Sequence, residues 1–446
     1  MSKTIIIIGA GLAGLSAALQ AAENGCNVKL VSSLPSERAQ SVMAEGGINA
    51  ALNTKDENDS PEEHFTDTIK AACGLADPNA VWGMTQAAPE LVHWLLKLGV
   101  KFNMSGYDDV DLRNFGGQKK KRTAFAQSDT GKQIMTAMID AVRRKEAFGM
   151  VERFSHHSFL TLRLCGNICC GCVIRDEYSQ ETVELPGDAV IVATGGMHGL
   201  FGNTTGSLSN TGEVTAELFR LGVPLANGEM IQYHPTTVKC GGKRMLISEA
   251  ARGEGGRLFA MKDGKQWYFM EEKYPELGNL MPRDITAREI WKVSHESEVF
   301  LDMTEISEEI ISNKLSGLAD DCMTYLHKDI RKEPVSVLPG IHYFMGGILV
   351  DEQHRTPIQN LYAAGECCAQ YHGANRLGGN SLLGALYGGR VAAKSACEQA
   401  DVVDLSCATQ IDFPPASQIS EIKQLNKVMQ ETMGVVRNEN RSEERR

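Results

Sequence analysis

The sequence predicts an α/β protein of two or three domains, and two observations support that prediction. The chain opens with an apolar strand from Ser2 to Ile8, a glycine turn, a helix to about Glu23, and a second strand from Val28 to Ser32. This β-α-β order is typical of a Rossmann-like domain. At 446 residues the chain is also longer than the roughly 250–300 residues at which a single core stops growing.

Composition narrows the class of protein. The net charge of −11 argues against nucleic acid as the main partner. No apolar run approaches the ~20 residues of a membrane span, and the first strand lacks a signal-peptide cleavage site. The twelve cysteines are expected to be reduced thiols, and the apolar flanks of Cys169-Cys170-Gly171-Cys172 favour a buried strand over a metal site. The basic run from Lys119 to Arg122 is expected to be a solvated loop.

The first turn carries a dinucleotide fingerprint, Gly9-Ala10-Gly11-Leu12-Ala13-Gly14. Its first glycines allow a tight turn and a close approach to a pyrophosphate, and the last lets helix and strand pack closely. The helix N-terminus adds unpaired N–H groups. Ser32 and Ser33 stand where an acidic residue usually ends the second strand, so we expect their hydroxyls to bond a ribose.

Later segments return to the same sheet. The strands expected at 188–196 and 360–366 both end in glycine turns, which makes the residues between about 230 and 345 an insertion. Near the C-terminus, apolar residues recur at helical spacing. They are Ile422, Leu425, Met429, Met433 and Val436.

Arginines and histidines in glycine- or proline-rich loops suggest an anion site. A guanidinium accepts both oxygens of a carboxylate, and nearby glycines let a ligand approach closely. Taken singly, each such residue is more typical of a surface or of packing, but a pocket containing all of them would bind a dianion. The residues are His234, Arg252, Arg283, His342 and Arg376.

These motifs resemble those of the flavoprotein subunits of fumarate reductase and succinate dehydrogenase and of the related L-aspartate oxidases. The resemblance runs from about residue 3 to 438. Besides the fingerprint, it rests on Ala44-Glu45-Gly46-Gly47, Gln232-Tyr233-His234-Pro235-Thr236, Arg252-Gly253-Glu254-Gly255-Gly256, Pro282-Arg283-Asp284, His342-Tyr343-Phe344-Met345-Gly346-Gly347 and Gly373-Ala374-Asn375-Arg376-Leu377-Gly378.

The resemblance implies a Rossmann-like FAD-binding domain with an inserted α+β capping domain and a short C-terminal helix. The FAD-binding domain is expected at 1–229 and 346–405, and the capping domain at 230–345. Residues 415–446 are expected to be the C-terminal helix and tail, a truncated form of the family's helical domain. FAD is the implied cofactor, and a small dicarboxylate the implied substrate.

The resemblance also assigns roles. A hydride passes from the flavin N5 to one alkene carbon, and Arg283 protonates the other, with Glu249 and Arg252 as its relay. The residues implied to hold the substrate are His234, Ser248, His342, Arg376, Phe115 and Gly47. The residues implied to hold FAD are Gly9, Ala10, Gly11, Leu12, Ala13, Gly14, Ser32, Ser33, Gln40, Ser41, Ala44, Gly46, Gly47, Thr194, Gly195, Glu213, Tyr343, Gly365, Glu366, Arg376, Ser381 and Leu382.

Two departures from the family pattern point to one member. Gln40 stands where membrane-complex members carry the histidine that bonds FAD covalently. An amide cannot form that bond, so FAD is expected to be non-covalent, and reduction of fumarate is the expected direction. Phe115 stands where L-aspartate oxidases carry a glutamate that meets the substrate ammonium, which favours fumarate over aspartate because a phenyl ring offers an amine no counter-charge.

Other functions stay open at this point. The chain is also compatible with an L-aspartate oxidase, a reductase of another unsaturated dicarboxylate, or a flavin-loaded subunit without turnover of its own. The intact proton relay favours an enzyme. An iron–sulfur or other electron-transfer subunit is the partner that the resemblance implies. The expected location is the cytoplasm, including attachment through partners to the inner face of the membrane.

Overall fold

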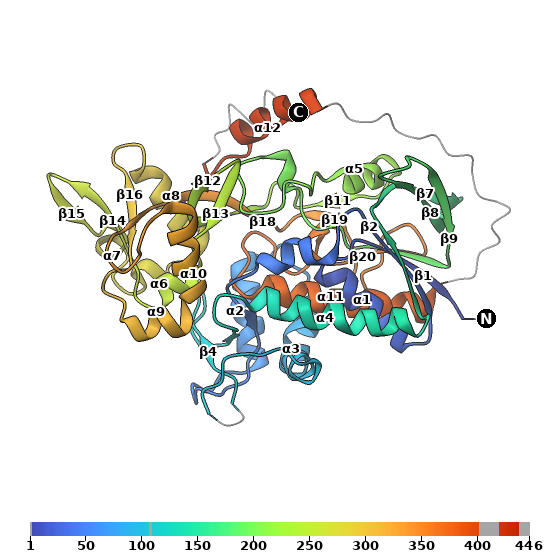
Figure 1. The fold of residues 1–446 in the computed structure, drawn as a ribbon, viewed down its shortest axis with the longest axis horizontal. Coiled ribbons are helices and arrows are strands. Elements are labelled where there is room, and N and C mark those ends of the chain that lie inside the picture. Colours follow the sequence, from blue (N-terminus) through green and yellow to red (C-terminus); the bar gives the residue numbers. More distant parts are fainter. Residues whose placement is uncertain (1, 107–108, 401–418, 437–446) are drawn as a thin grey trace.

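The central sheet is parallel and assembles strands from across the chain (Figure 1). The computed structural model describes residues 2–106, 109–400 and 419–436. Its five strands lie in the order β20-β10-β1-β2-β6 and all pair in parallel. Their bounds are Thr4–Ile8 (β1), Asn27–Ser32 (β2), Val151–Ser155 (β6), Ala189–Val192 (β10) and Leu361–Ala363 (β20). The predicted return of two later segments to the first sheet is therefore confirmed.

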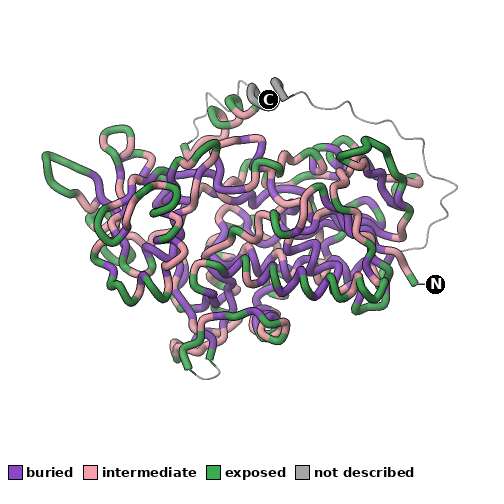
Figure 2. Tube along the Cα trace, in the orientation of Figure 1, coloured by how far each residue is buried: buried purple, intermediate pink, exposed green. Residues whose placement is uncertain are grey.

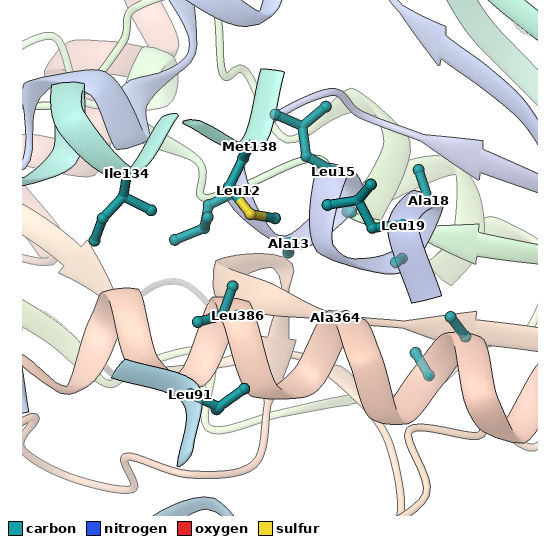
Figure 3. Close-up of a cluster of buried hydrophobic side chains, with 14 of the residues drawn as sticks. Leu12, Ala13, Leu15, Ala18, Leu19, Leu91, Ile134, Met138, Ala364 and Leu386 are labelled. Atoms are coloured by element: carbon teal, nitrogen blue, oxygen red, sulfur yellow. The ribbon is translucent and has the colours of Figure 1, made fainter. Parts of the chain in front are cut away.

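Helices rich in small residues cover one face of this sheet. Leu12–Glu23 (α1) and Asn380–Gln399 (α11) lie side by side, with Thr130–Ala147 (α4) and Pro78–Leu98 (α3) beyond them (Figures 1 and 3). A Cβ atom on Gly389 would lie 2.3 Å from the carbonyl oxygen of Ala13, so the two helix backbones approach too closely for any side chain there. Tight packing of this kind excludes water and holds the two helices in one relative position.

An antiparallel sheet lies against the other face. It comprises His157–Cys165 (β7), Ile168–Asp176 (β8) and Thr182–Pro186 (β9). Cys169, Cys170 and Cys172 are buried on β8, as the apolar flanks predicted. Within the described residues, ten cysteines carry free thiols, but Cys165 is disulfide-bonded, against the expectation of reduced thiols throughout.

The segment between residues 231 and 344 forms two further sheets with a core of its own. Ile231–Cys240 (β12) pairs antiparallel with Lys243–Leu246 (β13) and Leu338–Phe344 (β18). Buried Leu258, Phe269, Ile290 and Leu301 belong to its separate hydrophobic cluster. Buried residues run through the 231–344 segment as well as through the part of the molecule that contains the central sheet (Figure 2).

The 231–344 segment also contains a four-stranded sheet and a set of short helices. Its four-stranded sheet has the order β15-β14-β16-β17, from Lys265–Trp267, Arg257–Lys262, Val299–Asp302 and Val335–Ser336. Its helices are Glu249–Gly253 (α6), Phe269–Lys273 (α7), Arg283–Val293 (α8), Glu308–Lys314 (α9) and Ser316–Asp321 (α10).

Short elements connect the larger ones. They are Ile48–Asn49 (β3), Leu112–Arg113 (β4), Thr123–Ala124 (β5), Leu225–Ala226 (β11), Gly347–Leu349 (β19), Cys368–Ala369 (β21), Pro61–Ala72 (α2) and Glu213–Arg220 (α5). Within the described residues, no helix has the length and apolar character to cross a membrane.

The predicted C-terminal helix is present as Ile419–Thr432 (α12). Met429 and Met433 pack against a small cluster that contains Phe201 and Phe344. Leu425 is 41% exposed, so only part of the expected apolar stripe makes contact.

The end of the basic run is buried rather than solvated. Arg122 has no exposed surface and forms ion pairs of 2.9 Å with Asp59 and 3.0 Å with Asp67. Two carboxylates earlier in the chain therefore compensate its charge, which a solvated loop would not need.

Candidate active site

One cavity of about 310 Å³ runs from the start of α1 to the loops of the 231–344 segment. It brings together almost every residue predicted to contact cofactor or substrate. Two predicted residues do not line it. Gly14 packs behind the turn, where a Cβ would lie 1.8 Å from the carbonyl oxygen of Gly9, and Arg252 lies behind Glu249.

The turn before α1 is built to receive a phosphate group. Gly9 has a φ of +111°, and a Cβ there would lie 2.2 Å from the carbonyl oxygen of Ala193. Gly11 caps α1 without a side-chain hydrogen bond of its own, Leu12 N donates to Ser41 Oγ at 3.3 Å, and Gly11, Leu12 and Ala13 all line the cavity. At the end of β2, the Ser32 hydroxyl is buried without a protein partner. These features fit the pyrophosphate and a ribose hydroxyl of FAD.

A second helix begins at the same cavity. Gly379, with a φ of +86°, caps α11 without a side-chain hydrogen bond, and Ser381 and Leu382 line the cavity. The amide of Asn49 donates to the Gly378 carbonyl oxygen at 2.8 Å and fixes this turn. The positive end of the α11 dipole therefore faces the cavity and favours an anionic ring.

A buried carboxylate holds two arginines at the far end. Glu249 Oε2 accepts from Arg283 Nε at 2.8 Å, and its Oε1 accepts from Gly116 N at 3.0 Å and lies 3.3 Å from Arg252 Nη2. Burial raises the pKa of Glu249, but Arg283 and Arg252 outweigh it and hold the pKa below its usual value. Arg252 Nη1 also donates to the Asn279 carbonyl oxygen at 2.5 Å.

The third arginine lacks a counter-ion. Arg376 is 3% exposed, and no carboxylate in the described part of the chain forms an ion pair with it. Its guanidinium lies 4.4 Å from the centre of the Tyr343 ring. Burial and the charge of Arg283 lower its pKa to about 9. With Arg283 and Arg252 balanced by one carboxylate, the cluster has excess positive charge, which an anionic ligand would neutralise.

Two histidines face each other beside these arginines. The rings of His234 and His342 lie 5.1 Å apart, edge to face. Burial, and next the charge of Arg283, hold the pKa of both well below the usual value. His234 Nε2 is buried without a partner, whereas His342 Nδ1 bonds the Thr205 hydroxyl at 2.8 Å. Neutral imidazoles can donate hydrogen bonds to a carboxylate from these positions.

Phe115 and Ser248 complete the predicted set. Phe115 is 1% exposed and packs closely against Gly46, where a Cβ would lie 2.8 Å from the ring. Ser248 caps α6 by accepting from Ala250 N at 3.4 Å, and it lines the cavity.

Two further residues belong to the site but were absent from the predicted set. Gln232 Oε1 accepts from Arg283 Nη1 and from Arg376 Nη2, both at 3.0 Å, so one amide oxygen joins two like charges. Glu45 lines the cavity with one oxygen buried and unpartnered. Both lie in quoted motifs, but the spacing of the residues gave no signal of either role.

Comparison with known proteins defines the class of this flavoprotein. Residues 4–382 match the FAD binding domain family, and the chain belongs to that family. It is an FAD-dependent oxidoreductase of the succinate dehydrogenase and fumarate reductase type.

Individual relatives agree with this class. The chain is 44% identical over 413 residues to the succinate dehydrogenase flavoprotein subunit of Bacillus subtilis, covering 91% of this chain and 70% of that one. It is 34% identical over 404 residues to L-aspartate oxidase of Streptomyces coelicolor, covering 88% of this chain and 68% of that one. The structure resembles E. coli quinol fumarate reductase FrdA with a TM-score of 0.89 at 28% identity, covering 100% of this chain and 81% of that one.

Proposed function

We propose that this protein reduces fumarate to succinate with non-covalently held FAD. The observation that carries the proposal is the unbalanced positive charge of Arg376 and Arg283 beside two neutral histidines. A dicarboxylate supplies the missing negative charge, and the planar fork of each guanidinium matches a carboxylate. Arg376, His342, His234 and Ser248 would hold the two carboxylates.

Arg283 is the proposed proton donor. FAD, when bound and reduced, supplies the hydride to one alkene carbon. Protonation of the other carbon by Arg283 completes the CH₂–CH₂ product, because a developing carbanion is basic enough to take a guanidinium proton. Glu249 contacts both Arg283 and Arg252, so it can return a proton from the Arg252 side. The same cations stabilise the negative charge that develops on the substrate.

The proposed domains follow the expectations from the sequence. Residues 1–229 and 346–405 would form a Rossmann-like FAD-binding domain, and 230–345 a cap that covers the substrate. Of the C-terminal helix and tail expected at 415–446, α12 is described, and residues 401–418 and 437–446 lie outside the described residues. The separate hydrophobic core of the 231–344 segment supports this division.

An anaerobic titration tests the function. Fumarate added to the reduced full-length protein should restore the absorbance of oxidised flavin, whereas L-aspartate added to the oxidised protein should not bleach it. Bleaching by aspartate without reoxidation by fumarate would establish the alternative, an L-aspartate oxidase. Phe115→Glu should add a counter-charge for an ammonium group and weaken fumarate turnover, and Phe115→Leu serves as its apolar control.

Replacing Arg283 tests the proton donor. Arg283→Ala should abolish turnover while FAD stays bound, because the helix N-termini at the cofactor end are untouched. Arg288→Ala is the matched control, since Arg288 lies on the same helix, is exposed, and pairs with Asp284 at the surface. Turnover retained by Arg283→Ala would refute the assigned role.

The mode of FAD attachment has its own test. Gln40 lines the cavity as the first residue of a short helical turn, Gln40–Met43, and a carboxamide forms no stable bond to flavin. Acid precipitation should therefore leave all flavin in the supernatant, and flavin in the pellet would refute non-covalent binding. An iron–sulfur or other electron-transfer subunit is the proposed partner, with attachment to the inner face of a membrane only through it.

A further inference from the structure

Two thiols touch at the end of the molecule remote from the cavity. Cys26 lies between α1 and β2, and Cys397 lies in the last turn of α11. Their sulfur atoms are 2.9 Å apart. The chain positions differ by 371 residues, so the contact is a product of the fold and not of local sequence.

The setting of this pair differs from that of the other buried thiols. Cys367 and Cys368 lie near carbonyl oxygens, of Val192 at 3.3 Å and Gly365 at 3.2 Å. Cys26 is as buried as Cys368, at 6% exposed, but its sulfur contacts another thiol, and that partner, Cys397, is partly exposed. The residues around the pair, Asn24, Gly25 and Glu398, are exposed, so a small reagent can reach it.

We propose that Cys26 and Cys397 form a disulfide when a small disulfide oxidant, such as glutathione disulfide, is present. One thiolate of the pair attacks the oxidant, which forms a mixed disulfide and releases one thiolate. The thiolate of the other cysteine then attacks the mixed disulfide at the protein sulfur and releases the second. In total, two protein thiols lose two electrons and two protons, and the oxidant becomes two free thiols.

The surroundings of Cys397 affect the acidity of its thiol. Burial, and next the hydrogen bond with Cys26, raise the pKa of the Cys397 thiol. The ammonium of Lys3 donates to the Cys397 carbonyl oxygen at 2.7 Å and opposes this rise.

The disulfide would join the last turn of α11 to the residues that follow α1. The N-terminal ends of the same two helices line the part of the cavity that is predicted to hold the cofactor. α1 and α11 lie side by side, and residues at the start of each line the cavity (Figures 1 and 3). A cross-link between them limits local unfolding of this layer and closes a very long loop in the unfolded chain. We therefore expect higher thermal stability and slower loss of FAD, with unchanged turnover because neither thiol lies near the substrate residues.

Mass spectrometry on the unmodified chain is the primary test. The FAD-loaded protein is incubated with glutathione disulfide, quenched with N-ethylmaleimide, and digested without reduction. The expected result is a peptide pair joined through Cys26 and Cys397, together with an apparent Tm a few °C higher that dithiothreitol reverses. Stable glutathione on either thiol without closure, no loss of these two thiols, or an oxidant-dependent pair other than this one would overturn the proposal; the pair that contains the disulfide-bonded Cys165 is present with and without oxidant.

Variants separate the cross-link from oxidation elsewhere. Cys397→Ser should show neither the joined peptides nor the oxidant-dependent rise in Tm, and Cys26→Ser should behave alike. Cys73→Ala, which removes an exposed thiol, should keep both. A rise in Tm that persists in Cys397→Ser would refute the proposed consequence.

Discussion

The carboxyl group of Glu45 should make the stability of this protein fall as pH rises, and Glu45→Gln should remove that effect. Burial, and then the neighbouring carboxylates Asp321 and Asp129, raise the pKa of Glu45 from 4.5 to about 8, against the opposing charge of Arg113. One carboxyl oxygen is buried without a hydrogen-bond partner. The folded protein therefore stabilises the protonated form of the Glu45 carboxyl group.

The sign and size follow from linkage. Between pH 4.5 and about 8 the folded protein keeps a proton that the unfolded chain has released. The associated stability is fully present below pH 4.5 and is lost as pH rises to about 8. At about 1.4 kcal/mol per pKa unit, the total is at most about 5 kcal/mol. An unfolding entropy of ~2.1 cal/mol/K per residue makes this about 5 °C in Tm for a chain of this length.

Thermal unfolding followed by circular dichroism from pH 5 to 8.5 measures the effect. The Tm difference between the wild type and Glu45→Gln should change across this range in favour of the variant at high pH. Glu276→Gln, at an exposed position, is the matched control for the loss of one carboxylate. A pH-independent difference for Glu45→Gln would mean that this carboxyl does not titrate as described.

Two further substitutions test the site and the cofactor turn. Gln232→Leu removes the acceptor shared by Arg283 and Arg376. Since hydrogen bonds to charged groups contribute about 1.5–3 kcal/mol, kcat/KM for fumarate should fall at least about tenfold, and Gln232→Asn, which keeps a neutral amide acceptor, should lose less. An equal loss of kcat/KM in both variants would refute the role of Gln232 as the shared hydrogen-bond acceptor. Gly14→Ala places a Cβ 1.8 Å from a carbonyl oxygen and should abolish FAD retention on gel filtration, whereas Gly228→Ala, with open space around it, should retain it fully.

Residues whose role depends on local sequence were the ones that could be predicted. The glycine turn before α1 and the apolar strands follow from backbone geometry and from hydrophobic patterning, which short segments encode. The same holds for the helix at α12. Arg376 and Arg283 were found because each stands in a recognisable loop motif.

Residues whose role depends on distant partners could not be predicted. Gln232 joins Arg283, 51 positions later, to Arg376, 144 positions later. No periodicity connects residues so far apart. Arg122 was misjudged for the same reason, because charge runs are usually solvated and its partner Asp59 lies 63 positions earlier.

The strand order of the central sheet has a consequence for synthesis of the chain. β1 lies between β10 and β2, but β10 emerges more than 180 residues after β1. At about 5–20 residues per second, β1 waits roughly 10–40 s on the ribosome with one edge unpaired. An apolar strand with an open edge is a template for aggregation. Nascent chains halted before residue 189 should therefore bind chaperones, and chains extended past β20 should release them.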